Sequence, residues 1–167
     1  MTITAPVPLD DTHLLDAFHC GVPALDDWLK RRARGNTASG ASRTYVACKG
    51  STAVGYYALA AGAVEVAAAP GRFRRNMPDP IPVIVLGRLA IDRSAHGHGL
   101  GRALFRDAGL RVLQAADIIG VRGVLVDAIS DDAKAFYLAL GMQVSPLDPM
   151  TLMVTIADLR ASATGTP

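Results

Sequence analysis

The first 35 residues carry apolar positions at helical spacing. Leu25, Trp28 and Leu29 stand three and four residues apart, so a helix would place all three on one face. Proline near the start of this segment and glycine near its end are typical of helix boundaries. The pattern predicts two consecutive helices, over residues 10–21 and 22–35.

The central part of the chain carries the composition of β-strands. After a polar loop over residues 36–42, the segments 43–49 and 53–67 are rich in Val and Tyr and are separated by the turn at 50–51. This pattern is typical of two adjacent antiparallel strands. Residues 83–91 are apolar almost throughout, as expected of a central strand covered on both faces.

Helical and strand patterns alternate in the second half. Leu104, Ala108 and Val112 would share one side of a helix, with charged residues largely elsewhere. Ser130 is a suitable N-cap and Gly141 a suitable stop for a shorter helix. The expected order is a helix over residues 100–119, a strand over 123–128, a helix over 131–140 and a strand over 152–156.

Length and composition indicate a single globular domain. With 167 residues, half of them hydrophobic, the chain fits one domain, which we expect over residues 1–160, followed by a disordered tail over 161–167. Cys20 and Cys48 fit neither a disulfide framework nor a zinc site. The longest uncharged apolar run, residues 53–64, is too short to cross a bilayer, and no signal peptide pattern is present. We expect a cytoplasmic protein.

Charge is distributed unevenly along the chain. The formal net charge is only +2, but residues 30–93 hold eleven Lys or Arg side chains against three acidic ones. Two dense basic clusters lie in this part, at residues 30–34 and 72–75. One such cluster is usually a solvated surface, whereas two in one small domain favour contact with a polyanion such as nucleic acid.

Three glycines alternate between the strand expected at 83–91 and the helix that follows it. Gly97, Gly99 and Gly101 would let backbone N–H groups approach an anion closely, and the helix N-terminus and Arg102 would add positive charge. A plain corner between two packed elements would not need this spacing. The sequence therefore predicts a diphosphate-binding loop.

Other readings of the same loop fit less well. The dinucleotide pattern G-x-G-x-x-G fails because Arg102 stands at the position of the third glycine. His96 and His98 lack cysteine or carboxylate partners at metal-site spacing, so we expect no metal.

Two segments resemble the GNAT superfamily of acetyl-CoA-dependent N-acetyltransferases. Residues 86–105, LGRLAIDRSAHGHGLGRALF, resemble its motif A, a strand that runs into a Q/R-x-x-G-x-G/A loop and a helix, with His96 in the Gln/Arg place. Residues 130–142, SDDAKAFYLALGM, resemble its motif B, with Ser130 where Asn is usual. The resemblance implies an α/β (α+β) GNAT fold, in which helices flank a central mixed, mostly antiparallel sheet with splayed strands.

The resemblance also implies acetyl-CoA as cofactor. The diphosphate would lie on the glycine loop, and the backbone of strand 83–91 would pair with the pantetheine amides and polarise the thioester carbonyl. The residues expected to contact the cofactor are Leu89, Ala90, Ile91, His96, Gly97, His98, Gly99, Leu100, Gly101, Arg102, Ala103, Ser130 and Phe136.

A closer resemblance covers most of the chain. Residues 14–29, 43–47, 54–59 and 83–101 are similar to bacterial GNAT toxins of type II toxin-antitoxin systems, which acetylate the α-amino group of aminoacyl-tRNA and block translation. This resemblance implies a ribbon-helix-helix antitoxin as partner and a homodimer. An RNA substrate is consistent with the basic central part of the chain, and the residues expected to bind it are Lys30, Arg31, Arg32, Arg34, Arg72, Arg74, Arg75 and Arg88.

Tyr137 is the expected catalytic residue. It shares one face of the helix over residues 131–140 with Phe136, and its hydroxyl could donate a proton to the departing sulfur. A tyrosine on an apolar face is more often part of a core, but the family pattern favours catalysis.

No general base is evident, because Glu65 is the only glutamate and the aspartates lie mostly near helix starts and in loops. An α-amino group has a pKa near ~7.7–8.0, against ~10.4 for lysine, so a useful fraction is already neutral at cellular pH.

The alternatives to the toxin function are a GNAT enzyme for a small amine or a peptide N-terminus, and a non-catalytic binding module.

Overall fold

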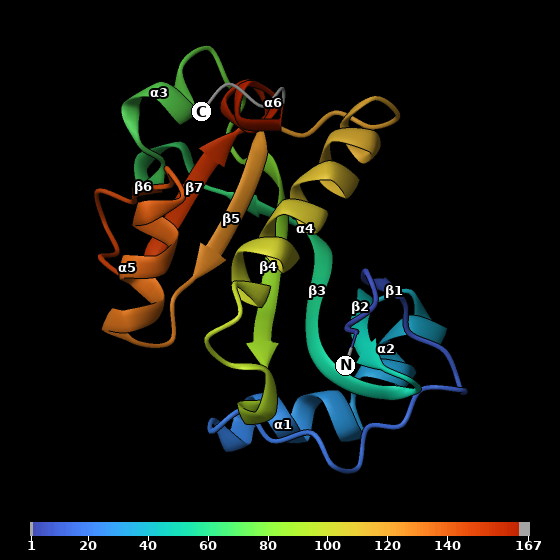
Figure 1. The fold of residues 1–167 in the computed structure, drawn as a ribbon. Coiled ribbons are helices and arrows are strands. Elements are labelled where there is room, and N and C mark those ends of the chain that lie inside the picture. Colours follow the sequence, from blue (N-terminus) through green and yellow to red (C-terminus); the bar gives the residue numbers. More distant parts are fainter. Residues whose placement is uncertain (1, 164–167) are drawn as a thin grey trace. The chain divides into compact units, whose positions relative to one another are not determined.

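The computed structural model describes residues 2–163. The elements, in chain order, are β1 (Val7–Pro8), α1 (Pro23–Arg31), α2 (Ala33–Ser39), β2 (Arg43–Lys49), β3 (Thr52–Val64), the 3-10 turn η1 (Val66–Ala68), α3 (Gly71–Arg74), β4 (Ile81–Ile91), the 3-10 turn η2 (Arg93–Ala95), α4 (Leu100–Ala116), β5 (Gly123–Asp127), α5 (Asp131–Ala139), β6 (Gln143–Val144), β7 (Thr151–Thr155) and α6 (Ile156–Ala163). The strand order is β1-β2-β3-β4-β5-β7-β6, with β4 and β5 parallel (Figure 1). The expected mixed, mostly antiparallel sheet with flanking helices is confirmed.

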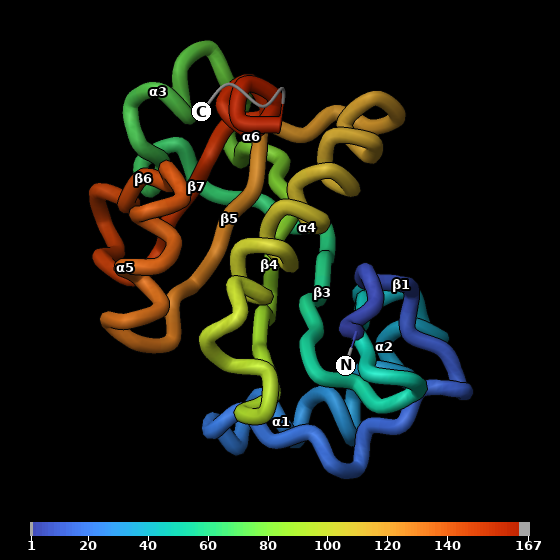
Figure 2. Tube along the Cα trace, in the orientation of Figure 1, coloured from blue at the N-terminus to red at the C-terminus, as the bar shows by residue number. Residues whose placement is uncertain are grey.

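Two compact units share the chain, and each combines two separated stretches of sequence. The first contains the residues up to Ala60 together with Gly87–Ala108, and the second contains Ala61–Leu86 together with the residues from Gly109 onward. Figure 2 lets the reader follow these stretches by colour, and β3, β4 and α4 each contribute to both units. A single domain over residues 1–160 and the splay of the strands stay predictions.

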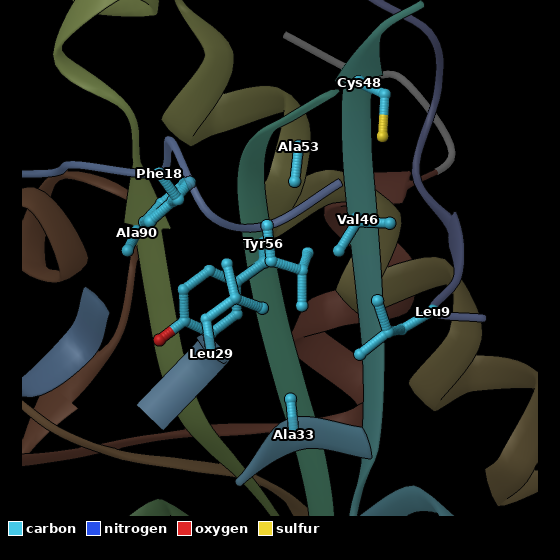
Figure 3. Packing of buried hydrophobic residues seen from close by; sticks show 10 residues of the cluster. Leu9, Phe18, Leu29, Ala33, Val46, Cys48, Ala53, Tyr56 and Ala90 are labelled. Carbon is cyan, nitrogen blue, oxygen red and sulfur yellow. The ribbon is translucent and has the colours of Figure 1, made fainter. Parts of the chain in front are cut away.

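In the first unit, helix α1 packs against strand β3. The ring of Tyr56 on β3 is fully buried, and its hydroxyl donates a 2.7 Å hydrogen bond to the carbonyl oxygen of Leu25. The Trp28 ring stacks on Tyr56 with the ring centroids 6.0 Å apart. Figure 3 shows Tyr56 within the buried cluster that also contains Leu29 and Phe18. Burial of the α1 apolar face therefore fixes this helix on the sheet.

The helix predicted over residues 10–21 is absent, and turns take its place. The Asp10 carboxylate accepts hydrogen bonds from the backbone N–H and the hydroxyl of Thr12, at 2.8 and 2.6 Å. The Arg34 guanidinium donates to the carbonyl oxygens of Asp10 and His13. These bonds occupy groups that a helix would need, which is how Asp commonly competes with helical structure. Leu15 in this segment is nevertheless buried.

The second predicted helix is divided and extends further than expected. α1 ends at Arg31, and α2 then runs through Gly35 into the segment predicted to be a polar loop. It ends at Gly40, whose φ of +81° is favourable for glycine. Ala33 is fully buried in the core of the first unit, so tertiary packing outweighs the weak helix propensity of Gly35.

In the second unit, β5 is a central strand. It pairs with β4 in parallel at Ile84↔Val124 and Val85↔Leu125, and with β7 antiparallel along its length. The short strand β6 extends the sheet beyond β7.

Helix α4 is shorter than the sequence pattern predicted. The helix expected to reach residue 119 ends at Ala116, and Ile118 is 89% exposed.

The C-terminal helix α6 was missed by the sequence pattern. The last predicted strand, over 152–156, ends at Thr155, and the chain then continues as a helix to Ala163. The predicted disordered tail is therefore wrong for residues 161–163, and residues 164–167 lie outside the described part. Within residues 2–163, no helix is long and apolar enough to span a membrane.

Gly123 marks a close approach between β5 and β7. A Cβ atom on Gly123 would collide with the carbonyl oxygen of Val154 and would lie 2.8 Å from Cε2 of Phe73. Backbone cannot yield as a flexible side chain can, so only glycine fits here.

We expect Gly123→Ala to destabilise the protein by more than about 2 kcal/mol, because the added methyl group forces β5 away from β7. Urea unfolding followed by circular dichroism measures this loss. Gly120→Ala is the matched control, since a Cβ there would meet no atom within 4 Å, and it should change stability by less than about 0.5 kcal/mol. Equal stability of the two variants would contradict the prediction.

Candidate functional site

The Asp92 carboxylate fixes the turn that leaves β4. It accepts hydrogen bonds from the backbone N–H of His19 at 2.7 Å, and from the backbone N–H and hydroxyl of Ser94 at 3.0 and 2.6 Å. Its own backbone N–H donates to the carbonyl oxygen of Val54 on β3. Burial alone would raise the pKa of Asp92, but these hydrogen bonds outweigh it and lower the pKa. Sequence analysis missed Asp92, although Asp two residues before Ser is a recognisable turn signal.

The glycine loop, residues 96–101, presents open backbone. Gly97 and Gly99 have φ values of +80° and +74°, and a Cβ on either would meet no atom within 4 Å. The backbone N–H of Ala103 donates to the carbonyl oxygen of Gly99 at 3.2 Å, and Gly101 lies in the first turn of α4. Helix-terminal N–H groups lack partners within the helix and attract anions. The loop thus fits the diphosphate of a nucleotide cofactor.

His96 closes the loop back onto β4. Its ring Nε2 lies 2.7 Å from the carbonyl oxygen of Ile91. A carbonyl oxygen only accepts, so Nε2 carries the proton and donates it. The side chain of His96 is therefore occupied in holding the loop, and its backbone N–H donates to the carbonyl oxygen of Arg93. His98 and Arg102 are exposed.

The end of β4 leads into this loop. Ala90 is buried in the core cluster of the first unit, whereas Leu89 and Ile91 are half-buried. Neighbouring strand residues point to opposite faces, so Leu89 and Ile91 share the face opposite Ala90. This alternation anchors the strand through Ala90.

Helix α5 in the second unit carries the predicted catalytic tyrosine. The Ser130 hydroxyl accepts a 3.1 Å hydrogen bond from the backbone N–H of Ala133, as expected of an N-cap. Phe136 and Tyr137 pack edge to face with centroids 5.2 Å apart. Tyr137 is 8% exposed, and burial raises the pKa of its hydroxyl to about 12. The hydroxyl therefore stays protonated at neutral pH and is able to donate.

The predicted cofactor and catalytic residues form two groups. One follows β4 and the glycine loop in the first unit, and the other lies on α5 in the second. The structure brings together the members within each group. That the two groups form one site stays a prediction.

Two of the predicted RNA-binding arginines are engaged within the protein. The Arg72 guanidinium makes two hydrogen bonds to the Asp158 carboxylate, at 3.0 and 2.9 Å, and these raise the pKa of Arg72. Arg34 donates to backbone carbonyl groups of the N-terminal segment, including that of His13. These contacts engage both guanidinium groups within the protein, and the RNA-binding role expected of the two residues stays a prediction.

The other predicted basic residues have their charge available. Arg88 on β4 lies over the ring of Trp28, with its central guanidinium carbon 4.5 Å from the ring centroid. The remaining members are exposed on the protein surface, and they are Lys30, Arg31, Arg32, Arg74 and Arg75. Within residues 2–163, no group of three His, Cys, Asp or Glu side chains is placed to hold a metal ion.

Known proteins similar to this chain include two toxins. The chain is 51% identical over 158 residues to a tRNA-acetylating toxin of Mycobacterium tuberculosis, and the match covers 95% of each chain. It is 31% identical over 166 residues to a probable toxin TacT of Sinorhizobium fredii, with 92% of each chain covered. No family model matches the chain.

Solved structures that are similar to this chain are also of toxins of this kind. AtaT complexed with acetyl-methionyl-tRNAfMet matches with a TM-score of 0.89 and 29% identity over 96% of this chain and 99% of that one. A tyrosine-to-phenylalanine variant of KacT matches with a TM-score of 0.90 and 26% identity over 97% and 99%. A similar variant of AtaT, bound to the C-terminus of the antitoxin AtaR and acetyl-CoA, matches with a TM-score of 0.83 and 28% identity over 98% and 99%. By these similarities, together with the strand, glycine loop and helix described above, the chain belongs to the GNAT toxins that acetylate aminoacyl-tRNA.

Proposed function

We propose that this protein transfers an acetyl group from acetyl-CoA to the α-amino group of aminoacyl-tRNA and thereby blocks translation, as the toxin of a type II toxin-antitoxin pair. The observation that carries the proposal is the open glycine loop between β4 and α4, in a chain 51% identical to a tRNA-acetylating toxin. We further propose that residues 1–160 act as a single acetyltransferase domain.

Bound acetyl-CoA supplies the acetyl group as a thioester. The backbone N–H groups of Gly97, Gly99 and the first turn of α4 would hold its diphosphate, because no atom lies where a Cβ of either glycine would stand and the backbone there is open to a ligand. The backbone of Leu89 to Ile91 orients the thioester carbonyl. Ser130 and Phe136 on α5 complete the set of residues that we assign to the cofactor.

Tyr137 donates the proton that the departing sulfur needs. General-acid donation of a proton to the departing sulfur would lower the barrier to breakdown of the tetrahedral intermediate. Burial keeps the pKa of Tyr137 at about 12, which preserves this proton over the physiological range. Both KacT and AtaT have been solved as variants in which a tyrosine is replaced by phenylalanine, which removes a hydroxyl group.

The amine substrate needs no strong base. An α-amino group with a pKa near ~7.7–8.0 is partly neutral at cellular pH, whereas a lysine side chain is almost wholly protonated. This favours an aminoacyl ester over a protein lysine. The exposed side chains of Arg31 on α1 and Arg74 on α3 supply positive charge for the RNA phosphates.

We propose two assemblies for this protein. A ribbon-helix-helix antitoxin would hold it inactive, by analogy with AtaT bound to the antitoxin AtaR. A homodimer would place the basic surfaces of both copies around one RNA. The cytoplasm, where charged tRNA is found, is the compartment that this activity requires.

The proposed function predicts that label in the acetyl group of acetyl-CoA is transferred to charged tRNA. Uncharged tRNA, free amino acids and small amines are the controls and should remain unlabelled. Hydrolysis of the aminoacyl ester should release labelled N-acetyl amino acid, which mass spectrometry identifies. Labelling of small amines in preference to charged tRNA would refute the toxin function and favour the small-amine enzyme.

Tyr137→Phe should lower kcat about a hundredfold, because the variant loses the proton donor but keeps the ring packing. Calorimetry should show acetyl-CoA affinity within about twofold of that of the wild type. For the wild-type protein, kcat/KM should rise up to about pH 8 as the substrate amine loses its proton. The value of kcat/KM should show no decline up to about pH 9, since the pKa of Tyr137 is about 12. An unchanged kcat in the variant would show that Tyr137 is not the donor.

Replacing Arg74 and Arg75 with Gln should raise the KM for charged tRNA several-fold and make it less sensitive to salt, because each lost phosphate contact reduces the salt slope by about one. Unfolding stability should not change, since both side chains are exposed. Arg72→Gln is the comparison: it breaks the ion pair with Asp158, so it should lower stability slightly with little effect on the salt slope. The reverse pattern would contradict our division of the arginines.

A further inference from the structure

Arg88 differs from the other arginines of the basic region. It lies on β4 directly before Leu89, and its guanidinium rests on the ring of Trp28 at 4.5 Å from the centroid. Within residues 2–163, no carboxylate pairs with Arg88, whereas Arg34 and Arg72 are held by acceptors of the protein itself. A guanidinium has five N–H donors, and contact with a ring face leaves them free for another partner.

The ring beneath Arg88 is itself fixed. Trp28 stacks on Tyr56 with an angle of 8° between the ring planes, and Tyr56 is fully buried and bonded to the Leu25 carbonyl oxygen. Phe18 packs against Tyr56 edge to face at 5.5 Å. Burial raises the pKa of the Tyr56 hydroxyl, and the positive charge of Arg88 offsets part of this rise. The Arg88 cation is therefore held in place before any ligand arrives.

The position of Arg88 defines which anion it can meet. It lies one residue before the backbone that we assign to the thioester carbonyl, and its side chain shares the face of β4 that carries Ala90, against which Trp28 also packs. In aminoacyl-tRNA, the nearest negative charge to the α-amino group is the phosphodiester on the 5′ side of the terminal nucleoside. A cationic small amine would instead be repelled by an unpaired guanidinium.

Helix α1 continues the positive surface beyond this point. Arg31 is exposed and stands three residues after Trp28, so both lie on one side of the helix. A chain of phosphates that leaves Arg88 thus meets a second cation.

We propose that Arg88 binds the phosphodiester next to the terminal nucleoside of aminoacyl-tRNA, and that Trp28 is the positioning residue that holds its guanidinium for this contact. The inference rests on the proposed function, and it adds the contact that positions the α-amino group of the substrate beside β4. Arg88 touches the substrate, whereas Trp28 acts only through Arg88.

Two minimal substrates with the same amino acid isolate this contact. Aminoacyl-adenosine lacks the phosphodiester, and the aminoacylated dinucleotide CpA contains it. We expect the wild-type protein to prefer the dinucleotide at least tenfold in kcat/KM, as an arginine bonded to phosphate warrants. Arg88→Gln should reduce this ratio to about one, mainly through a lower kcat/KM for the dinucleotide.

Variants of Trp28 test the positioning role. Trp28→Leu should lose most of the preference for the dinucleotide, whereas Trp28→Phe, which keeps a ring face, should retain part of it. A loss of structure would lower kcat/KM for both substrates alike, so the ratio separates positioning from folding. Arg106→Gln is the matched control: Arg106 is exposed on α4, and the ratio should stay at the wild-type value.

The same ratio in the wild-type protein and in Arg88→Gln would overturn the inference while leaving the proposed function intact. Equal ratios in Trp28→Leu and the wild type would refute the role of Trp28. Failure of the wild-type protein to acetylate charged tRNA is a different result, because it would refute the proposed function and this inference with it.

Discussion

The hydrogen bonds of the Asp92 carboxylate fix the turn that joins β4 to the glycine loop. They join the turn after this strand to the segment before α1 and to Ser94, while the backbone N–H of Asp92 joins it to β3. The glycine loop begins only a few residues later, and glycine at positive φ is otherwise costly to order. A loop that is fixed in advance pays less entropy when a ligand binds. The turn held by Asp92 thus fixes the start of the exposed, glycine-rich loop that we propose as the anion site.

Electrostatic roles in the basic region follow from what each arginine touches. Arg72 and Arg34 have acceptors within the protein, and their charges serve the fold. Arg74 and Arg75 are exposed and free to respond to a polyanion. Arg88 is held by an aromatic ring and not by a carboxylate, so it is fixed and still unneutralised. Sequence composition assigns all of these residues to one class, whereas their contacts separate them into three.

The proposed chemistry requires few strongly perturbed groups. Tyr137 needs only to remain neutral, as an ordinary tyrosine already does at neutral pH, and burial raises its pKa further. The substrate amine has a low pKa of its own, so the missing general base is no obstacle. Much of the remaining requirement is geometric, and in the proposed site it falls to backbone N–H groups whose positions depend on the turn at Asp92 and on the start of α4.

The sequence by itself determined the features that depend on neighbouring residues. Strand β4, the Ser130 cap and the apolar face of α4 follow from short-range sterics and hydrogen bonds, and they were predicted correctly, whereas binding of a diphosphate by the alternating glycines stays a prediction. Tertiary structure alone decided that residues 10–21 form turns tied to Arg34, and that α2 continues through Gly35 because Ala33 is buried. It also decided that Arg72 pairs with Asp158 and that Arg88 meets Trp28. These contacts join residues far apart along the chain, and no local pattern records them, because only the folded chain brings such partners within reach.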